Sequence, residues 1–301
     1  MQKNKRVISN IFTIFFLILF LIYLDDNREL GETLASISVI NILFLLFLSI
    51  CRLFSISFTN SYLYKKVDLD LSFLQSFNIV CLNRLGNKIA PIAAGSGYKL
   101  YYFTKIRKVQ MTSYLVLNAN YTVLTTLLNI LFLFVTIFFY LGFSNFSYLF
   151  ITLTLGLIIL ISFILILKTK FFSNFNFIKT LKTVSINFYK ADLNFFIIIL
   201  SSLLTLFINI FFIFYVINIY SIKANIFDIS LFYTIGQTVN IFSITPGNIG
   251  ILEAIQISLQ NLYSFNTSEI LLITFLSRAI DYIVTAITYV FSNSMVKKLN
   301  T

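Results

Sequence analysis

Charged residues are scarce in this chain, and several of them stand inside apolar sequence. Only 11% of the 301 residues are charged, whereas soluble domains carry about 25%. Arg84 and Lys88 are four residues apart, so they share one face of a helix. Arginine can hold a phosphate through two parallel hydrogen bonds. The pair therefore predicts a phosphate site, and the alternative is that both side chains reach out to the edge of an apolar layer.

Three more charged residues occupy the second half of the chain. Glu253 follows a break in the apolar sequence, Thr-Pro-Gly-Asn-Ile-Gly-Ile-Leu, at residues 245–252. It could bind a cationic headgroup or a proton, or it could pair with Arg278. Arg278 and Asp281 are three residues apart on one helix face, so a local ion pair is a further alternative. Together with Arg84 and Lys88, these residues form the predicted substrate site.

Two stretches of helix-breaking residues must position these charges. The chain has only two prolines, Pro91 and Pro246, which are 155 residues apart, about half the chain length. Proline stops a helix and glycine allows unusual backbone conformations. We therefore expect two broken-helix hairpins that meet near the middle of a membrane. Their tips are predicted at Pro91, Gly95, Gly97, Pro246, Gly247, Asn248 and Gly250.

Composition limits the class of protein. The chain is 58% hydrophobic with a mean hydropathy of +0.91, which indicates an integral membrane protein. It contains no histidine, the commonest general base and metal ligand. We therefore expect no catalytic residue, no metal and no cofactor. The net charge of +11 fits basic cytoplasmic loops better than nucleic-acid binding.

The predicted fold is an all-α membrane protein with about six full transmembrane helices and two re-entrant hairpins. The single membrane domain, residues 1–301, would hold two repeats of opposite orientation, residues 7–140 and 146–295, a pattern typical of transporters. If residues 228–245 cross alone, seven or eight spans result. Basic residues place both termini in the cytoplasm, and Arg52 is expected to reach the headgroups. The predicted spans are residues 7–24, 33–58, 111–140, 146–167, 193–217 and 270–295, and the hairpins are residues 71–98 and 228–262.

The motifs resemble those of the lysylphosphatidylglycerol synthase transmembrane-region family, the flippase-like membrane domain of the multiple peptide resistance factor. Family members often carry an acidic residue after the first motif, where this chain has Tyr98 and Lys99. Full-length synthases add a soluble aminoacyl-transfer domain, which we do not expect here. The residues that carry the resemblance are Pro246, Gly247, Asn248, Ile249, Gly250, Glu253 and Arg278, and more weakly Arg84, Pro91, Gly95 and Gly97.

The resemblance implies a flippase-like transporter of the prokaryotic inner membrane. The substrate does not transfer from the family. The pair Arg84 and Lys88 instead predicts a phosphate-containing lipid, either a modified phospholipid or a polyprenyl-linked one. A membrane-embedded lipid-linked transferase and a non-catalytic partner of a separate synthase are the alternatives. The expected partners are the lipid itself and a separate headgroup synthase or glycosyltransferase.

Overall fold

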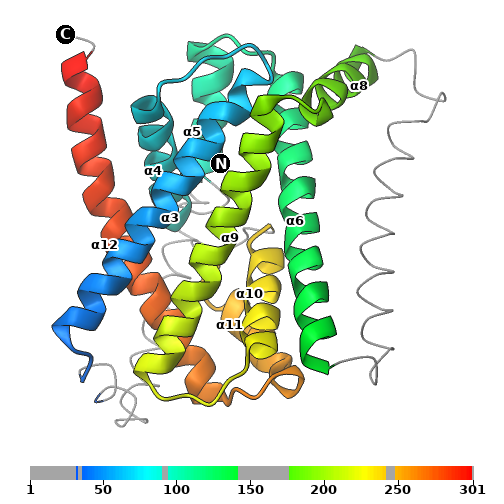
Figure 1. Ribbon diagram of the computed structural model, residues 1–301. Coiled ribbons are helices and arrows are strands. Elements are labelled where there is room, and N and C mark those ends of the chain that lie inside the picture. The colour runs from blue at the N-terminus through cyan, green and yellow to red at the C-terminus, as the bar shows by residue number, and fades with distance from the viewer. Residues whose placement is uncertain (1–31, 33–35, 90–93, 142–175, 242–247, 300–301) are drawn as a thin grey trace, which may run out of the picture. The chain divides into compact units, whose positions relative to one another are not determined.

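The computed structural model describes residues 32, 36–89, 94–141, 176–241 and 248–299, and this part of the chain is helical without strands (Figure 1). A π-helical turn, Tyr102–Ile106, and a 3-10 turn, Gln260–Leu262, join longer elements. The α-helices are α3 (Val39–Lys65), α4 (Phe73–Ile89), α5 (Ala94–Tyr101), α6 (Met111–Leu141), α8 (Asn176–Tyr189), α9 (Leu193–Ile219), α10 (Ile226–Ile241), α11 (Ile251–Ser258) and α12 (Thr267–Leu299).

Four of the described helices, α3, α6, α9 and α12, are long and apolar enough to cross a membrane. They confirm four predicted spans in position. Helix α3 begins later than predicted because Ser38 Oγ accepts the backbone N–H of Asn41 at 3.3 Å and so caps its first turn. It also ends later than predicted, at Lys65. The predicted spans at residues 7–24 and 146–167 lie outside the described residues, so the count of six stays a prediction.

Both predicted hairpin regions contain a pair of helices. Helices α4 and α5 occupy the first, and α10 and α11 occupy the second. Pro91, Pro246 and Gly247 lie outside the described residues, and so does the predicted approach of the two prolines. Helix α10 has 16 residues, a length of about 24 Å, whereas a hydrocarbon core is about 30 Å thick. Re-entrant insertion of the hairpins stays a prediction.

The described chain forms two compact units. One contains the described residues within 1–54, 77–99 and 207–301, and the other contains those within 55–76 and 100–206. The units are assembled from interleaved stretches, whereas the proposed repeats are successive halves of the chain. The repeats therefore remain a prediction. All predicted site residues belong to the first unit.

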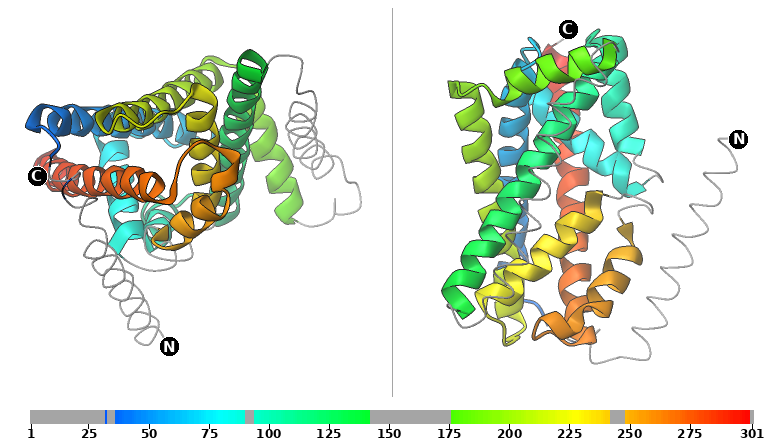
Figure 2. Two further views of the ribbon diagram at one scale, coloured as in Figure 1. Left: turned by 90° about the horizontal axis from the view of Figure 1, so that it is seen from below. Right: turned by 90° about the vertical axis from the view of Figure 1, so that its right-hand side faces the viewer.

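Helix α12 contacts α3, α4 and α11 within the first unit. Helix α4 runs antiparallel to it, with hydrogen bonds from Ser292 Oγ to Asn78 Oδ1 at 3.1 Å and between Cys81 Sγ and Thr288 Oγ1 at 3.5 Å. Helices α10 and α11 also pack together in this unit (Figure 2). These contacts bring charges from distant parts of the sequence to one side chain of α12.

A glycine contact closes the α4–α5 hairpin. A Cβ atom built on Gly95 would lie 1.9 Å from the backbone oxygen of Asn83, and one on Gly86 would lie 2.7 Å from Gly95 Cα. Asn87 and Ser96 add two hydrogen bonds, from Asn87 Nδ2 to Ser96 Oγ at 3.2 Å and from the Ser96 backbone N–H to Asn87 Oδ1 at 3.0 Å. Small residues allow this close approach of helix backbones.

The second unit is held by polar contacts between apolar helices. Thr59 Oγ1 in α3 donates to Ser201 Oγ in α9 at 2.8 Å, and Ser55 Oγ donates to the Ser201 carbonyl at 3.0 Å. Helix α8 packs on α6, and Asn120 Nδ2 donates to Ser185 Oγ at 2.9 Å. Such hydrogen bonds contribute about 0.6 kcal/mol each within a membrane, so they align the helices more than they stabilise them.

A buried lysine joins three helix ends of the second unit. The Lys66 side chain is 3% exposed, and its Nζ donates to the carbonyls of Asn187 and Lys190, each at 3.2 Å, and to Asp192 Oδ1 at 2.7 Å. Asp192 Oδ1 also accepts the backbone N–H of Phe195 at 2.9 Å, which caps α9. The hydrogen bond from Lys66, supported by that of Phe195, holds the pKa of Asp192 below its usual value.

We predict that Asp192→Asn lowers thermal stability at neutral pH because it leaves the Lys66 ammonium without its carboxylate. The lowered folded pKa means that this stabilisation is present above the unfolded pKa of about 3.9 and disappears as pH falls through the folded value. Melting temperatures of the two proteins should therefore differ by a constant amount from pH 7 down to about pH 4, and the difference should disappear only as pH falls further, through the lowered folded pKa. A difference that persists unchanged through that fall would contradict the assignment.

Candidate functional site

Three cationic side chains of the first unit converge on one carboxylate. Arg84 Nη2 donates to Asp281 Oδ2 at 3.2 Å and to Oδ1 at 3.3 Å. Arg52 Nη2 and Lys88 Nζ form short ion pairs with Oδ1 and Oδ2 of the same side chain. We call Arg52, Arg84, Lys88 and Asp281 the Asp281 cluster. Its members come from α3, α4 and α12, and their side chains are only 11–23% exposed.

Neutral side chains accept hydrogen bonds from some of the cluster's donor atoms. Arg52 Nη1 donates to Asn209 Oδ1 at 3.2 Å, and Arg52 Nη2 donates to Ser49 Oγ at 2.9 Å. Lys88 Nζ donates to Thr285 Oγ1 at 3.1 Å and lies 4.7 Å from the centre of the Tyr282 ring. These groups solvate the cations without neutralising them, so positive charge remains.

A second ion pair lies one helical turn earlier on α12. Arg278 Nη2 is 3.0 Å from Glu253 Oε1 and donates to the carbonyl of Asn248 at 3.1 Å. Both carboxylate and guanidinium side chains are 16% exposed. Glu253 Oε2 also accepts the backbone N–H of Gly250 at 2.9 Å and so caps α11. Of the two roles considered for Glu253, pairing with Arg278 is the one that the structure contains.

The backbone of the second motif needs its asparagine and glycine. Asn248 has φ of 55° and Gly250 has φ of 83°, values that glycine adopts freely and asparagine tolerates better than most residues. The Asn248 side chain also donates to Asn240 Oδ1 at 3.0 Å and to the carbonyl of Val239 at 3.3 Å. The motif is thereby fixed both to the end of α10 and, through Arg278, to α12.

The sequence missed one member of the site. We expected Arg52 to reach the headgroups, which is wrong, because its side chain is 13% exposed and pairs with Asp281 across 229 residues of sequence. The sequence did contain one indication of a buried partner, because Arg52 is the only charged residue of α3 before Lys65. Asp281 was placed in the site, but its partners are three cations of α3 and α4. Arg278 pairs with Glu253 instead.

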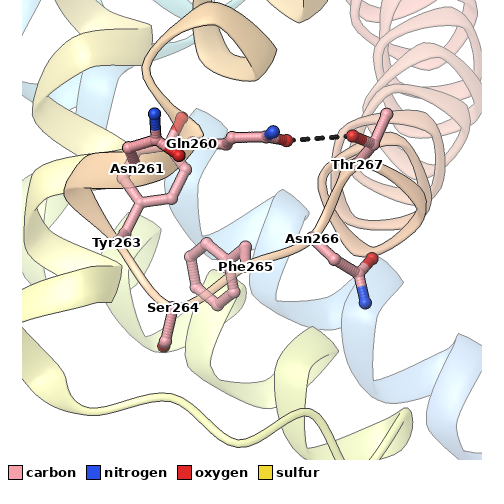
Figure 3. A pocket seen from close by; sticks show the side chains of 7 residues that line it. All are labelled: Gln260, Asn261, Tyr263, Ser264, Phe265, Asn266 and Thr267. Carbon is pink, nitrogen blue, oxygen red and sulfur yellow. Dashed lines mark hydrogen bonds between the residues drawn. The ribbon is translucent and has the colours of Figure 1, made fainter.

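The hollow in Figure 3 is a separate feature. It has a volume of about 370 Å³ and lies in the turn between α11 and α12. Gln260 Oε1 accepts a hydrogen bond from Thr267 Oγ1 at 2.9 Å across it. None of its lining residues is charged, so it lacks the chemistry of the Asp281 cluster. The lining residues are Gln260, Asn261, Tyr263, Ser264, Phe265, Asn266 and Thr267.

Long apolar helices that carry buried charges define the chain as an integral membrane protein. The family model for the lysylphosphatidylglycerol synthase transmembrane region matches residues 7–288, nearly the whole chain. The chain therefore belongs to the lysylphosphatidylglycerol synthase transmembrane-region family, as its motifs predicted. No curated protein and no solved structure matches it.

Proposed function

We propose that this protein is a flippase-like transporter that moves a phosphate-containing lipid between the leaflets of a membrane. The observation that carries the proposal is the Asp281 cluster, in which three cations surround one carboxylate. A charge at the centre of a bilayer costs about 2.5–3.5 kcal/mol on insertion scales. A substrate phosphate that contacts the three cations during transport would offset this cost.

The architecture supports transport over a purely structural role. Helices α4 and α11 carry site residues, and each belongs to a helix pair within a predicted hairpin. We propose that both hairpins are re-entrant, and that residues 7–140 and 146–295 form inverted repeats. In such transporters, broken helices meet near the bilayer midplane and supply the substrate site. The proposal also places the protein in a prokaryotic inner membrane with both termini cytoplasmic, because basic residues flank the predicted inner ends.

Arg84→Gln provides the test. Asp281 keeps Arg52 and Lys88 as partners in this variant, so the fold should persist. The variant loses one charged hydrogen bond between residue 84 and the substrate phosphate, which contributes about 1.5–3 kcal/mol. Lipid movement should therefore slow roughly ten- to hundredfold. The measurement is the transfer of fluorescent phosphatidylglycerol between leaflets of proteoliposomes. Glu253→Gln should slow transfer as well, because it weakens the contact with Arg278 that fixes the second motif.

Lys65→Gln is the matched control, since it removes one positive charge from a 37% exposed side chain outside the cluster. Transfer should be unchanged in this variant. Transfer at the wild-type rate in both Arg84→Gln and Glu253→Gln, with normal folding, would leave these residues structural. The transport site would then have to be sought elsewhere in the chain.

A further inference from the structure

The Asp281 cluster holds more positive charge than it neutralises. Among the residues that the structure describes, three cations face one carboxylate, which leaves a surplus of two positive charges. The neighbours that bind the leftover donors, Asn209, Ser49 and Thr285, are neutral. Uncompensated charge is costly in a poorly solvated site, so the surplus indicates the charge of a complementary ligand. A ligand with two negative charges would balance it.

The cluster also has donors that can reach such a ligand. Both hydrogen bonds from Arg84 to Asp281 come from Nη2, so Nε and Nη1 of the same planar group make no hydrogen bond within the described part of the chain. Arg84 is also the most exposed of the four side chains, at 23%. Arg52 Nε and the Tyr282 hydroxyl are buried without a hydrogen-bond partner among the described residues. These groups suit the three acceptor oxygens of a terminal phosphate.

We propose, on the basis of the function proposed above, that the lipid headgroup at this site is a dianionic phosphate without an amine. A phosphomonoester carries about −1.5 to −2 charges at pH 7, and a diphosphate linkage carries a similar charge. An ordinary phosphodiester lipid has a single negative charge and would leave one cation unbalanced. An aminoacylated headgroup adds positive charge and would be repelled. The cluster therefore selects by charge.

Equilibrium binding to the detergent-solubilised protein tests the proposal at pH 8, where a phosphomonoester is fully ionised. The probes are short-chain phosphatidate, phosphatidylglycerol with the same acyl chains, and its lysyl ester. Phosphatidate should bind at least about tenfold more tightly than phosphatidylglycerol, a difference of about 1.4 kcal/mol, and the lysyl ester should bind most weakly. Equal binding of the three, or preference for the lysyl ester, would overturn the proposal.

Variants test whether the Asp281 cluster causes the preference for phosphatidate over phosphatidylglycerol. Arg84→Gln should lose this preference, whereas Arg84→Lys and the control Lys65→Gln should retain it. An unchanged preference in folded Arg84→Gln would overturn the assignment to the cluster. Inorganic phosphate is the remaining probe, and competition as strong as that of phosphatidate would overturn the lipid source in favour of free phosphate. The order of lipid affinities of the wild-type protein requires no variant. It therefore tests the proposal even if Arg84→Gln fails to fold.

The binding and transport results can fail separately. A preference for phosphatidate without movement of any lipid would support the ligand class and contradict the transporter. Movement of lipids without that preference would support the transporter and overturn the ligand class.

Discussion

Asp281→Asn should be the most destabilising single substitution of the site. It replaces the carboxylate that holds Arg52, Arg84 and Lys88 together. Removing one partner from a buried ion pair costs about 3–5 kcal/mol, because the remaining charge is left uncompensated. A loss of that size is a large share of the stability of most proteins. We expect low expression and a markedly lower melting temperature.

Unfolding can be followed by a thiol-reactive dye, because Cys81 is 0% exposed in the folded protein. Asp70→Asn is the control, since its carboxylate is 86% exposed and its pair with Lys65 spans 3.6 Å. Exposed pairs contribute little, so this variant should melt like the wild type. Adding Arg52→Gln to Asp281→Asn should recover part of the loss by removing one uncompensated cation. A wild-type melting temperature for Asp281→Asn would show that the cluster is not a coupled network.

Gly95→Ala should open the hairpin of α4 and α5. The added Cβ atom would lie 1.9 Å from the Asn83 carbonyl oxygen, and that atom belongs to the backbone of α4 and cannot rotate away. The helices must therefore separate, which breaks the contact with Gly86 and shifts Arg84 relative to Asp281. Overpacking of this kind costs about 1–3 kcal/mol and occasionally more. We expect both a lower melting temperature and slower lipid movement.

Gly97→Ala is the matched control on the same helix. Apart from its own helix, a Cβ atom at Gly97 would have no atom of the described residues within 4 Å. Alanine also favours a helix by about 1 kcal/mol relative to glycine, so this variant should be as stable as the wild type or slightly more stable. Equal behaviour of the two variants in the dye assay would contradict the close packing of α4 and α5.

Four membrane spans could be predicted because apolar length is a local signal. The spans at α6 and α9 begin at Met111 and Leu193, as expected from composition alone. Glycine at positions 95 and 250 was also identified from sequence. In the structure each position requires glycine for a different reason, a close backbone contact at Gly95 and a positive φ at Gly250. Sequence alone does not distinguish these two requirements.

The partners within the site could not be predicted, because they depend on packing between distant helices. Local spacing suggested that Arg278 would pair with Asp281, three residues away. In the folded protein α11 brings Glu253 to Arg278, while α3 and α4 bring their cations to Asp281. The pairing of Arg52 joins residues 229 positions apart, and no spacing rule reaches that far. The charges themselves were visible in the sequence, but the surplus of positive charge appeared only after folding.

The most direct measurement is identification, by mass spectrometry, of the lipids that co-purify with the protein. We predict that a phosphate-containing lipid is enriched with the wild-type protein relative to the surrounding membrane. The enrichment should disappear in Arg84→Gln and persist in Lys65→Gln. Enrichment that is equal in all three proteins, or no enriched phosphate lipid in any of them, would contradict a lipid-phosphate site at Asp281.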